Sequence, residues 1–292
     1  AAGLLIALCA GPAAAEGFLW LYRGFTRLSA RMALGARKAF WLAFGVMLLC
    51  WLPVIIAYFP GITGYDMDFQ MDQLRRGAYS SHHPLLHTLF IGLFWKLGAL
   101  LGNESAGYGA HTVAQAVLLA ASIAYALSWL NTLRCHKGFW YALLAYFALS
   151  PQHAVLAVSG TKDVLFAAAM LVSVVELCRL LSEPERRARR GVLAWDAAVI
   201  ALAGLLRNNA VYALALTLLV SFLFFRRKVG RRVLCVMLAG MMAAAGGAAA
   251  LERLTQARGV SVREMLSIPC QQLARVYAKY GLDAPVGYEI RE

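Results

Sequence analysis

Charged residues are scarce in this sequence. Only 15% of the chain is Asp, Glu, Lys or Arg, whereas 61% is hydrophobic, and the mean hydropathy is +0.63. A water-soluble surface needs a larger charged fraction, so a soluble globular domain is excluded. Acidic residues are the scarcest, because 15 Asp and Glu stand against 28 Lys and Arg and leave a formal net charge of +13.

Motifs that bind metals or nucleic acids are also missing. The six cysteines are far apart and form no CxxC pair, which argues against a metal or disulfide framework. The basic residues fall between apolar runs and not on one solvated face, so we expect no nucleic-acid partner. Their placement is typical of topology determinants and of contacts with anionic membrane lipids.

Long apolar runs are abundant. A bilayer core of roughly 30 Å is crossed by about 20 apolar residues in a helix. Such runs occupy roughly 39–59, 108–133, 138–157, 160–181, 193–206, 210–225 and 233–251, with a weaker one near 3–22 and a further apolar piece over 85–102. The sequence therefore predicts an all-α fold, a single polytopic transmembrane helical bundle over residues 1–292. The first residue is not methionine, and we expect a fragment or a processed form.

The positions of Lys and Arg predict the topology. More than half of them lie in four clusters, 23–38, 134–137, 179–190 and 226–232. Positive loops mark the cytoplasmic side. All four clusters can lie there only if 85–102 does not cross the membrane, and Lys96 in its middle favours an interfacial or re-entrant helix within the first outer loop.

This scheme places most polar motifs on one side. The outer segments become 60–107, 150–162, 207–209 and 252–292. We therefore predict a multi-pass protein of the cell (cytoplasmic or inner) membrane, with its active site on the outer side.

The first outer segment carries three carboxylates shortly after a Pro-Gly turn. On a helix, Asp66 shares a face with Gln70, and Asp68 shares a neighbouring face with Asp72. The pattern is compatible with a solvated loop, with a cation site, or with a general base at the membrane surface.

Three histidines follow, His82, His83 and His87. The last two have the i, i+4 spacing of helical metal ligands, but no HExxH motif is present. We expect His82 and His83 to hydrogen-bond a substrate or to cap the helix that starts at Pro84. We predict no resident metal, and a divalent cation as cofactor stays open.

Lys162 and Asp163 open a helix on the outer side, after Ser-Gly-Thr. The helix N-terminus explains the aspartate. A lysine beside free N–H groups suits a phosphate, although a lysine at this level also snorkels to the membrane surface.

Arg207, Asn208 and Asn209 interrupt the stretch 193–225. That stretch would be about 50 Å long as one helix, so it must break, and we predict two helices that meet near 207–209. Arginine at such a turn suits a phosphate, or it pairs with an aspartate, for which Asp66, Asp68 and Asp163 are the candidates. In the last outer segment, Gln271, Gln272 and Arg275 are either substrate contacts or one turn of a surface helix.

Taken in order, the motifs PGxxxYDxxxQ, HHPLLHT, SGTKD, LLRNN and SIPCQQLAR resemble the GT-C superfamily of integral membrane glycosyltransferases. Within it, they are most similar to bacterial members of unknown function. The resemblance covers roughly residues 40–280, with a lower span count than is usual in the superfamily. It implies an enzyme that moves a sugar from a polyprenyl-phosphate donor, usually with inversion, to a glycan, lipid or protein acceptor.

The resemblance also implies roles for the polar residues. Asp66 is similar in position to the essential acidic residue of the superfamily, and Asp68 is its rival. Lys162 and Arg207 are expected to bind the donor phosphate. The expected substrate-binding residues are His82, His83, Gln70, Asp163, Asn208, Gln271, Gln272 and Arg275.

Two other functions remain as alternatives. A multi-pass transporter or lipid flippase also buries polar residues between broken helices. However, the chain shows no repeat symmetry, and its polar groups gather at one surface. A non-catalytic membrane scaffold is the third possibility.

Overall fold

The computed structural model describes residues 34–133, 135–259 and 266–281. Within them the regular elements are helices, and strand pairing is limited to two isolated bridges, Ile62 with Ser159 and Ser80 with Arg258. The predicted all-α fold is confirmed. The weaker apolar run near 3–22 lies outside the described residues.

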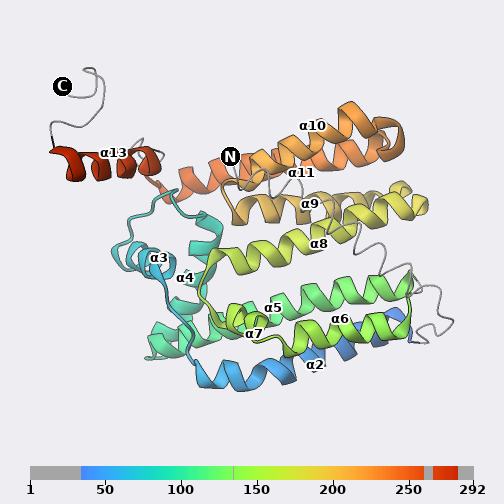
Figure 1. Ribbon diagram of the computed structural model, residues 1–292, viewed down its shortest axis with the longest axis horizontal. Helices are drawn as coiled ribbons and strands as arrows, with labels where there is room; N and C mark the ends of the chain where they lie inside the picture. Colours follow the sequence, from blue (N-terminus) through green and yellow to red (C-terminus); the bar gives the residue numbers. More distant parts are fainter. Residues whose placement is uncertain (1–33, 134, 260–265, 282–292) are drawn as a thin grey trace.

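The long helices lie side by side, from α2 and α6 through α5, α8 and α9 to α10 and α11 (Figure 1). The elements in chain order are α2 (Ala36–Ala57), α3 (Tyr65–Arg76), α4 (Leu85–Leu100), α5 (Glu104–Thr132), α6 (Lys137–Leu149), α7 (Pro151–Val158), α8 (Lys162–Ser182), the 3₁₀ turn η1 (Pro184–Ala188), α9 (Arg190–Leu206), α10 (Ala210–Val229), α11 (Arg231–Thr255) and α13 (Ser267–Tyr280).

The bundle has the helices of a multi-pass membrane protein. Five of the described helices, α2, α5, α8, α10 and α11, are long and apolar enough to cross a bilayer, and α6 with α7 adds a sixth if this pair, bent by 50°, is one span. The outward faces of these helices stay apolar, as Leu49 of α2 and Leu216 and Phe224 of α10 illustrate. Large apolar side chains on the outside of a bundle are expected where lipid is the solvent.

The predicted break in the stretch 193–225 is confirmed. The helix α9 ends at Leu206, Arg207 has an extended backbone, and α10 begins at Ala210. Two helices of 17 and 20 residues replace the single long one.

The basic residues gather at one end of the bundle. We call it the basic end. It is formed by the starts of α2, α6, α9 and α11 and by the ends of α5, α8 and α10, on the right in Figure 1. The opposite end, where α2, α9 and α11 finish and α8 and α10 begin, carries α3 and α4 and is called the Asp66 end. The described parts of the four Lys/Arg clusters thus share one end, as the topology scheme requires.

The helix α4 lies at the Asp66 end and is not among the candidate spans (Figure 1). It packs closely on α5 through two glycines. A Cβ atom added to Gly98 would lie only 2.5 Å from the Cα atom of Gly107, so no larger side chain fits there. This agrees with the prediction that 85–102 does not cross the membrane, and Lys96 is exposed.

Candidate functional site

The loop between α2 and α3 and the loop between α7 and α8 are joined at the Asp66 end by backbone hydrogen bonds. The N–H of Ile62 donates to Val158 O at 2.9 Å, and the N–H of Gly160 donates to Ile62 O at 2.9 Å. Buried Gln115 of α5 supports the junction, since its Nε2 donates to the carbonyl oxygens of Ala157 at 3.1 Å and Ser159 at 2.8 Å. The junction brings the start of α3 to the start of α8.

Asp66 and Lys162 form an ion pair at this junction. Lys162 Nζ donates a hydrogen bond to the Asp66 carboxylate and lies 3.5 Å from Nδ1 of buried His83. Partial burial acts to raise the pKa of Asp66, but the hydrogen bond and charge of Lys162, together with His83 and His82, outweigh it, so the pKa is lowered overall. Asp66 is therefore held as a carboxylate, the form that a general base requires.

The other two carboxylates of α3 lie apart from this pair. Asp68 is exposed, and Asp72 accepts a hydrogen bond from Arg76 at 2.8 Å on the helix surface. Of the three candidates for an acidic site, Asp66 alone contacts a cation from another helix among the described residues.

The loop that carries His82 and His83, called the histidine loop, packs against α3. The ring centroids of His82 and His83 are 4.6 Å apart, and Phe69 lies 5.9 and 5.1 Å from them. Asn208 holds the loop from the α9–α10 turn, because its Nδ2 donates to the carbonyl oxygens of Ser81 at 2.8 Å and His82 at 3.2 Å. In the described part of the chain, no three His, Cys, Asp or Glu side chains are arranged to hold a metal ion.

Arg207 and Asp163 form a second ion pair beside the first. The guanidinium group of Arg207 donates to the Asp163 carboxylate and lies 5.4 Å from the centroid of the Phe166 ring. Both partners are well exposed, with 41% and 51% of their side-chain surface accessible. Pairing with an aspartate was the structural alternative to a phosphate role for Arg207. Because the pair is exposed, the guanidinium group stays accessible to a ligand.

Beneath the two ion pairs lies a row of buried polar side chains that sequence reasoning largely missed. Gln70 is fully buried, its Nε2 donates to Thr88 Oγ1 at 3.0 Å, and its Oε1 lies 3.0 Å from His87 Nδ1. These contacts hold α3 on α4, so the polar atoms of Gln70, a predicted substrate contact, are engaged inside the protein. Fully buried His111 of α5 continues the row, with its ring centroid 6.0 Å from that of His87.

His87 is kept neutral by its surroundings. Burial lowers its pKa from 6.5 to about 3, and the nearby His111 and Lys162 act in the same direction. A neutral imidazole can donate through Nδ1 to the carbonyl oxygen of Gln70 while its other nitrogen stays unprotonated. The i, i+4 spacing of His83 and His87 is the signal in the sequence that links the two histidines, but it does not predict the burial of His87 against Gln70.

A cavity of about 240 Å³, the polar cavity, adjoins the ion pairs. Its polar lining consists of Ser81, His83, Asn208 and Glu252. Glu252, at the end of α11, was not among the predicted site residues, because nothing in the chain order links it to the histidine loop.

An apolar groove of about 500 Å³ runs between α4, α5, α8 and α9. It extends from Leu86 and Leu206 at the Asp66 end to Tyr125 and Trp195 farther along the bundle. Leu86 also lines the polar cavity, so the two spaces are neighbours.

The structure brings together Asp66, Lys162, His82, His83, Asp163, Arg207 and Asn208 among the predicted site residues. Gln271, Gln272 and Arg275 instead lie exposed on α13, away from these contacts. They have the surroundings of a surface helix, the second of the two interpretations given for them.

Comparison with known proteins identifies a family but no characterised relative. Residues 74–285 match a family model described as a family of unknown function, DUF6020. No curated protein and no solved structure matches the chain significantly.

Proposed function

We propose that this chain, which belongs to the DUF6020 family of unknown function, is a membrane glycosyltransferase that takes sugar from a polyprenyl-phosphate donor. The observation that carries the proposal is the convergence of Asp66, Lys162 and Arg207 beside an apolar groove. A lipid-linked sugar phosphate needs a base, cations and an apolar surface for its tail. The resemblance of the motifs to the GT-C superfamily supports the same reaction.

In this proposal Asp66 acts as the general base. It removes the proton from the acceptor hydroxyl as that oxygen forms a bond to the anomeric carbon. The bond between this carbon and the donor phosphate oxygen breaks, and its electron pair leaves with the polyprenyl phosphate. Once Asp66 is protonated, the charge of Lys162 is no longer neutralised and can stabilise the negative phosphate.

The groove and the cavity provide the remaining binding surfaces. The apolar groove starts at Leu206, next to Arg207, and suits the hydrocarbon tail of the donor. Its phosphate would then lie near Arg207, where fork geometry favours phosphate over a single hydrogen-bond acceptor. The polar cavity beside His83 and Glu252 has hydrogen-bonding groups for the sugar or the acceptor, which would be a glycan, a lipid or a protein.

The proposed location is the cytoplasmic membrane, with the Asp66 end on the outer side. The basis is the gathering of arginine and lysine at the basic end, which marks the cytoplasmic face of membrane proteins.

A lipid flippase or transporter is the second candidate. The observation in its favour is that the apolar groove meets, at Tyr125, a polar pocket of the basic end. Such a connection is what a lipid would need to pass between the two ends.

Substitution of Asp66 by Asn tests the proposal. The purified protein is reconstituted in vesicles with polyprenyl-phosphate hexoses or pentoses, and sugar transfer is measured. Loss of a general base typically reduces the rate about 10²–10⁴-fold. Asp72→Asn is the matched control, because Asp72 contacts only Arg76 in the described structure.

Two outcomes would contradict the assignment. Near-normal transfer by a folded Asp66→Asn protein would show that Asp66 is not the general base. Movement of a fluorescent polyprenyl lipid across the vesicle membrane without any transferred sugar favours the flippase.

A further inference from the structure

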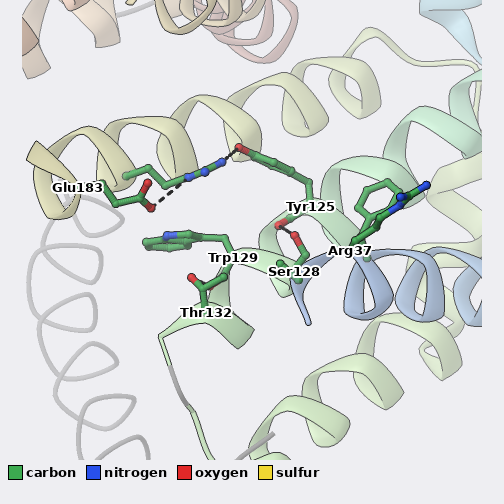
Figure 2. Close-up of a pocket in the computed structure, with 9 residues that line it drawn as sticks. Arg37, Tyr125, Ser128, Trp129, Thr132 and Glu183 are labelled. Atoms are coloured by element: carbon green, nitrogen blue, oxygen red, sulfur yellow. Dashed lines mark hydrogen bonds and ion pairs between the residues drawn. The ribbon is translucent and has the colours of Figure 1, made fainter. Parts of the chain in front are cut away.

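A separate pocket lies at the basic end, far from the two ion pairs. Its volume is about 460 Å³, and it opens between α2, α5 and α8. The residues that line it are Ala36, Arg37, Phe40, Tyr125, Ser128, Trp129, Thr132, Arg179 and Glu183. Figure 2 shows the indole of Trp129 beside the side chain of Glu183, and Arg37 on the other side of Tyr125 and Ser128. The glycosyltransferase proposal gives this pocket no role.

The negative charges near the pocket are already bound to arginines. Arg179 Nε donates to Glu183 at 3.3 Å, and Arg186 Nε lies 3.9 Å from the other oxygen of the same carboxylate. Buried Glu176 behind the pocket accepts from Tyr125 and Arg186. These carboxylates therefore leave little free negative charge to face a ligand.

Arg37 contributes positive charge to the pocket from a different helix. It is exposed at the start of α2, and it forms no ion pair with any of the residues that the structure describes. An arginine at a pocket wall without a carboxylate partner is a binding element for an anion.

Trp129 supplies a hydrogen-bond donor that lacks an acceptor. Its Nε1 is buried and finds no partner among the described residues. Buried donors are almost always satisfied, so this group calls for an acceptor. The hydroxyl groups of Ser128 and Thr132 donate to backbone carbonyls at 3.0 and 2.6 Å. Their oxygens could still accept a hydrogen bond, but neither accepts one from the indole N–H.

We propose that this pocket binds the phosphate group of an anionic membrane phospholipid. The Arg37 guanidinium is a donor for phosphate oxygens, the indole N–H on the other side of the pocket is a donor for another oxygen of the same head group, and Phe40 and Trp129 provide apolar rings for the glycerol region. The pocket lies where membrane helices end among basic residues, which is the level of the head groups. A phospholipid fits this position better than a soluble anion, because one wall of the pocket is aromatic.

The test measures lipid binding to the intact purified chain. Native mass spectrometry in detergent counts bound phosphatidylglycerol and bound phosphatidylcholine across a titration of each. Phosphatidylglycerol should bind more tightly than phosphatidylcholine. Arg37→Gln should weaken phosphatidylglycerol binding about tenfold, and Trp129→Phe, which keeps the ring and removes the N–H, about threefold.

Lys38→Gln is the matched control. It removes the same charge from the neighbouring exposed residue, which does not line the pocket, and should change binding less than about twofold. An equal effect of Lys38→Gln and Arg37→Gln would overturn the proposal, because binding would then depend on diffuse surface charge. Equal binding of the two lipids would overturn it as well.

Inorganic phosphate distinguishes the source of the ligand. Competition by millimolar phosphate, lost in Arg37→Gln, would support a pocket that recognises phosphate from either source. Absence of competition, with phosphatidylglycerol binding still sensitive to Arg37→Gln, would support a site that requires the lipid. The melting temperature of each variant, compared with that of the unmodified chain, verifies the fold.

Discussion

Lys162 donates a hydrogen bond to Asp66 across 96 positions of the chain, and this contact joins the first turn of α8 to the first turn of α3. The backbone junction between Ile62 and the 158–160 segment places both helix starts side by side. The ion pair makes the largest contribution to the lowered pKa of Asp66, with smaller ones from His83 and His82, whereas burial alone would raise it. The protonation of Asp66 therefore depends on Lys162.

Replacing Lys162 with Met tests this dependence. With the ammonium gone, burial is opposed only by the smaller effects of His83 and His82, so the pKa of Asp66 should rise. The acidic limb of the pH–rate profile for sugar transfer should then move to higher pH, whatever happens to the maximal rate. Lys162→Arg keeps the charge and should leave the limb near its original position. An unmoved limb in Lys162→Met would show that another group sets the protonation of the base.

Arg207→Gln separates a structural role from phosphate binding. The Arg207–Asp163 pair is exposed, so its loss should cost about 1 kcal/mol of stability or less. If Arg207 binds the donor phosphate, transfer should fall about 10-fold or more. Arg253→Gln, at an exposed position of α11, is the control for a general loss of positive charge. If the transfer rate falls by no more than the loss of folded protein explains, Arg207 has a purely structural role.

Much of the bundle follows from sequence pattern. The apolar runs predict the long helices, and the length of 193–225 predicts the break at Arg207, because one helix of that length exceeds what tilting in a bilayer usually absorbs. The charge clusters predict which helix ends lie together. These features depend on local composition and on the membrane, and both can be read along the chain.

The partners of the polar residues could not be predicted in the same way. Helical spacing correctly placed Asp66 and Gln70 on one helix, but it could not show that Gln70 is buried against Thr88 and His87. Nor could it choose Asp163 as the partner of Arg207, since three aspartates were available. Pairing depends on how separate helices pack, and Glu252 reached the polar cavity only through that packing.

The buried carboxylates near the basic end make unequal contributions to stability. Glu176 accepts hydrogen bonds from Tyr125 and Arg186, whereas Asp196 has one ion-pair partner among the described residues, Arg186 at 3.8 Å, and lies beside the Glu176 carboxyl group. Glu176→Gln should therefore destabilise the bundle by about 3–5 kcal/mol, because it leaves a buried arginine poorly paired. Asp196→Asn should cost much less, since it removes a buried charge that is poorly compensated. Thermal unfolding in detergent measures both, and a larger loss for Asp196→Asn would contradict the assignment.

Accessibility labelling tests the proposed orientation. A cysteine introduced at Thr63, exposed at the Asp66 end, should react with a membrane-impermeant maleimide added outside intact cells. A cysteine at Glu185, exposed in η1 at the basic end, should react only after the cells are permeabilised. Both are introduced into a chain whose six native cysteines are replaced by serine or alanine. Labelling of Glu185→Cys from outside would reverse the orientation, and the proposed site would then face the cytoplasm.

His87 should make the stability of the fold depend on pH in the mildly acidic range. Its pKa is about 3 in the folded protein and 6.5 in a solvated chain, so below pH 6.5 the unfolded state takes up a proton that the folded state does not. The stability that neutral His87 contributes is fully present above pH 6.5 and is lost as the pH falls toward 3. The loss approaches about 1.4 kcal/mol for each pH unit between these values. His87→Asn keeps an N–H near Gln70 and cannot take up this proton. The stability of the unmodified chain should therefore fall faster than that of the variant between pH 6.5 and 4, measured by thermal unfolding in one detergent. Groups that do not interact with His87 act equally on both proteins, so parallel curves would mean that His87 is not held neutral by burial.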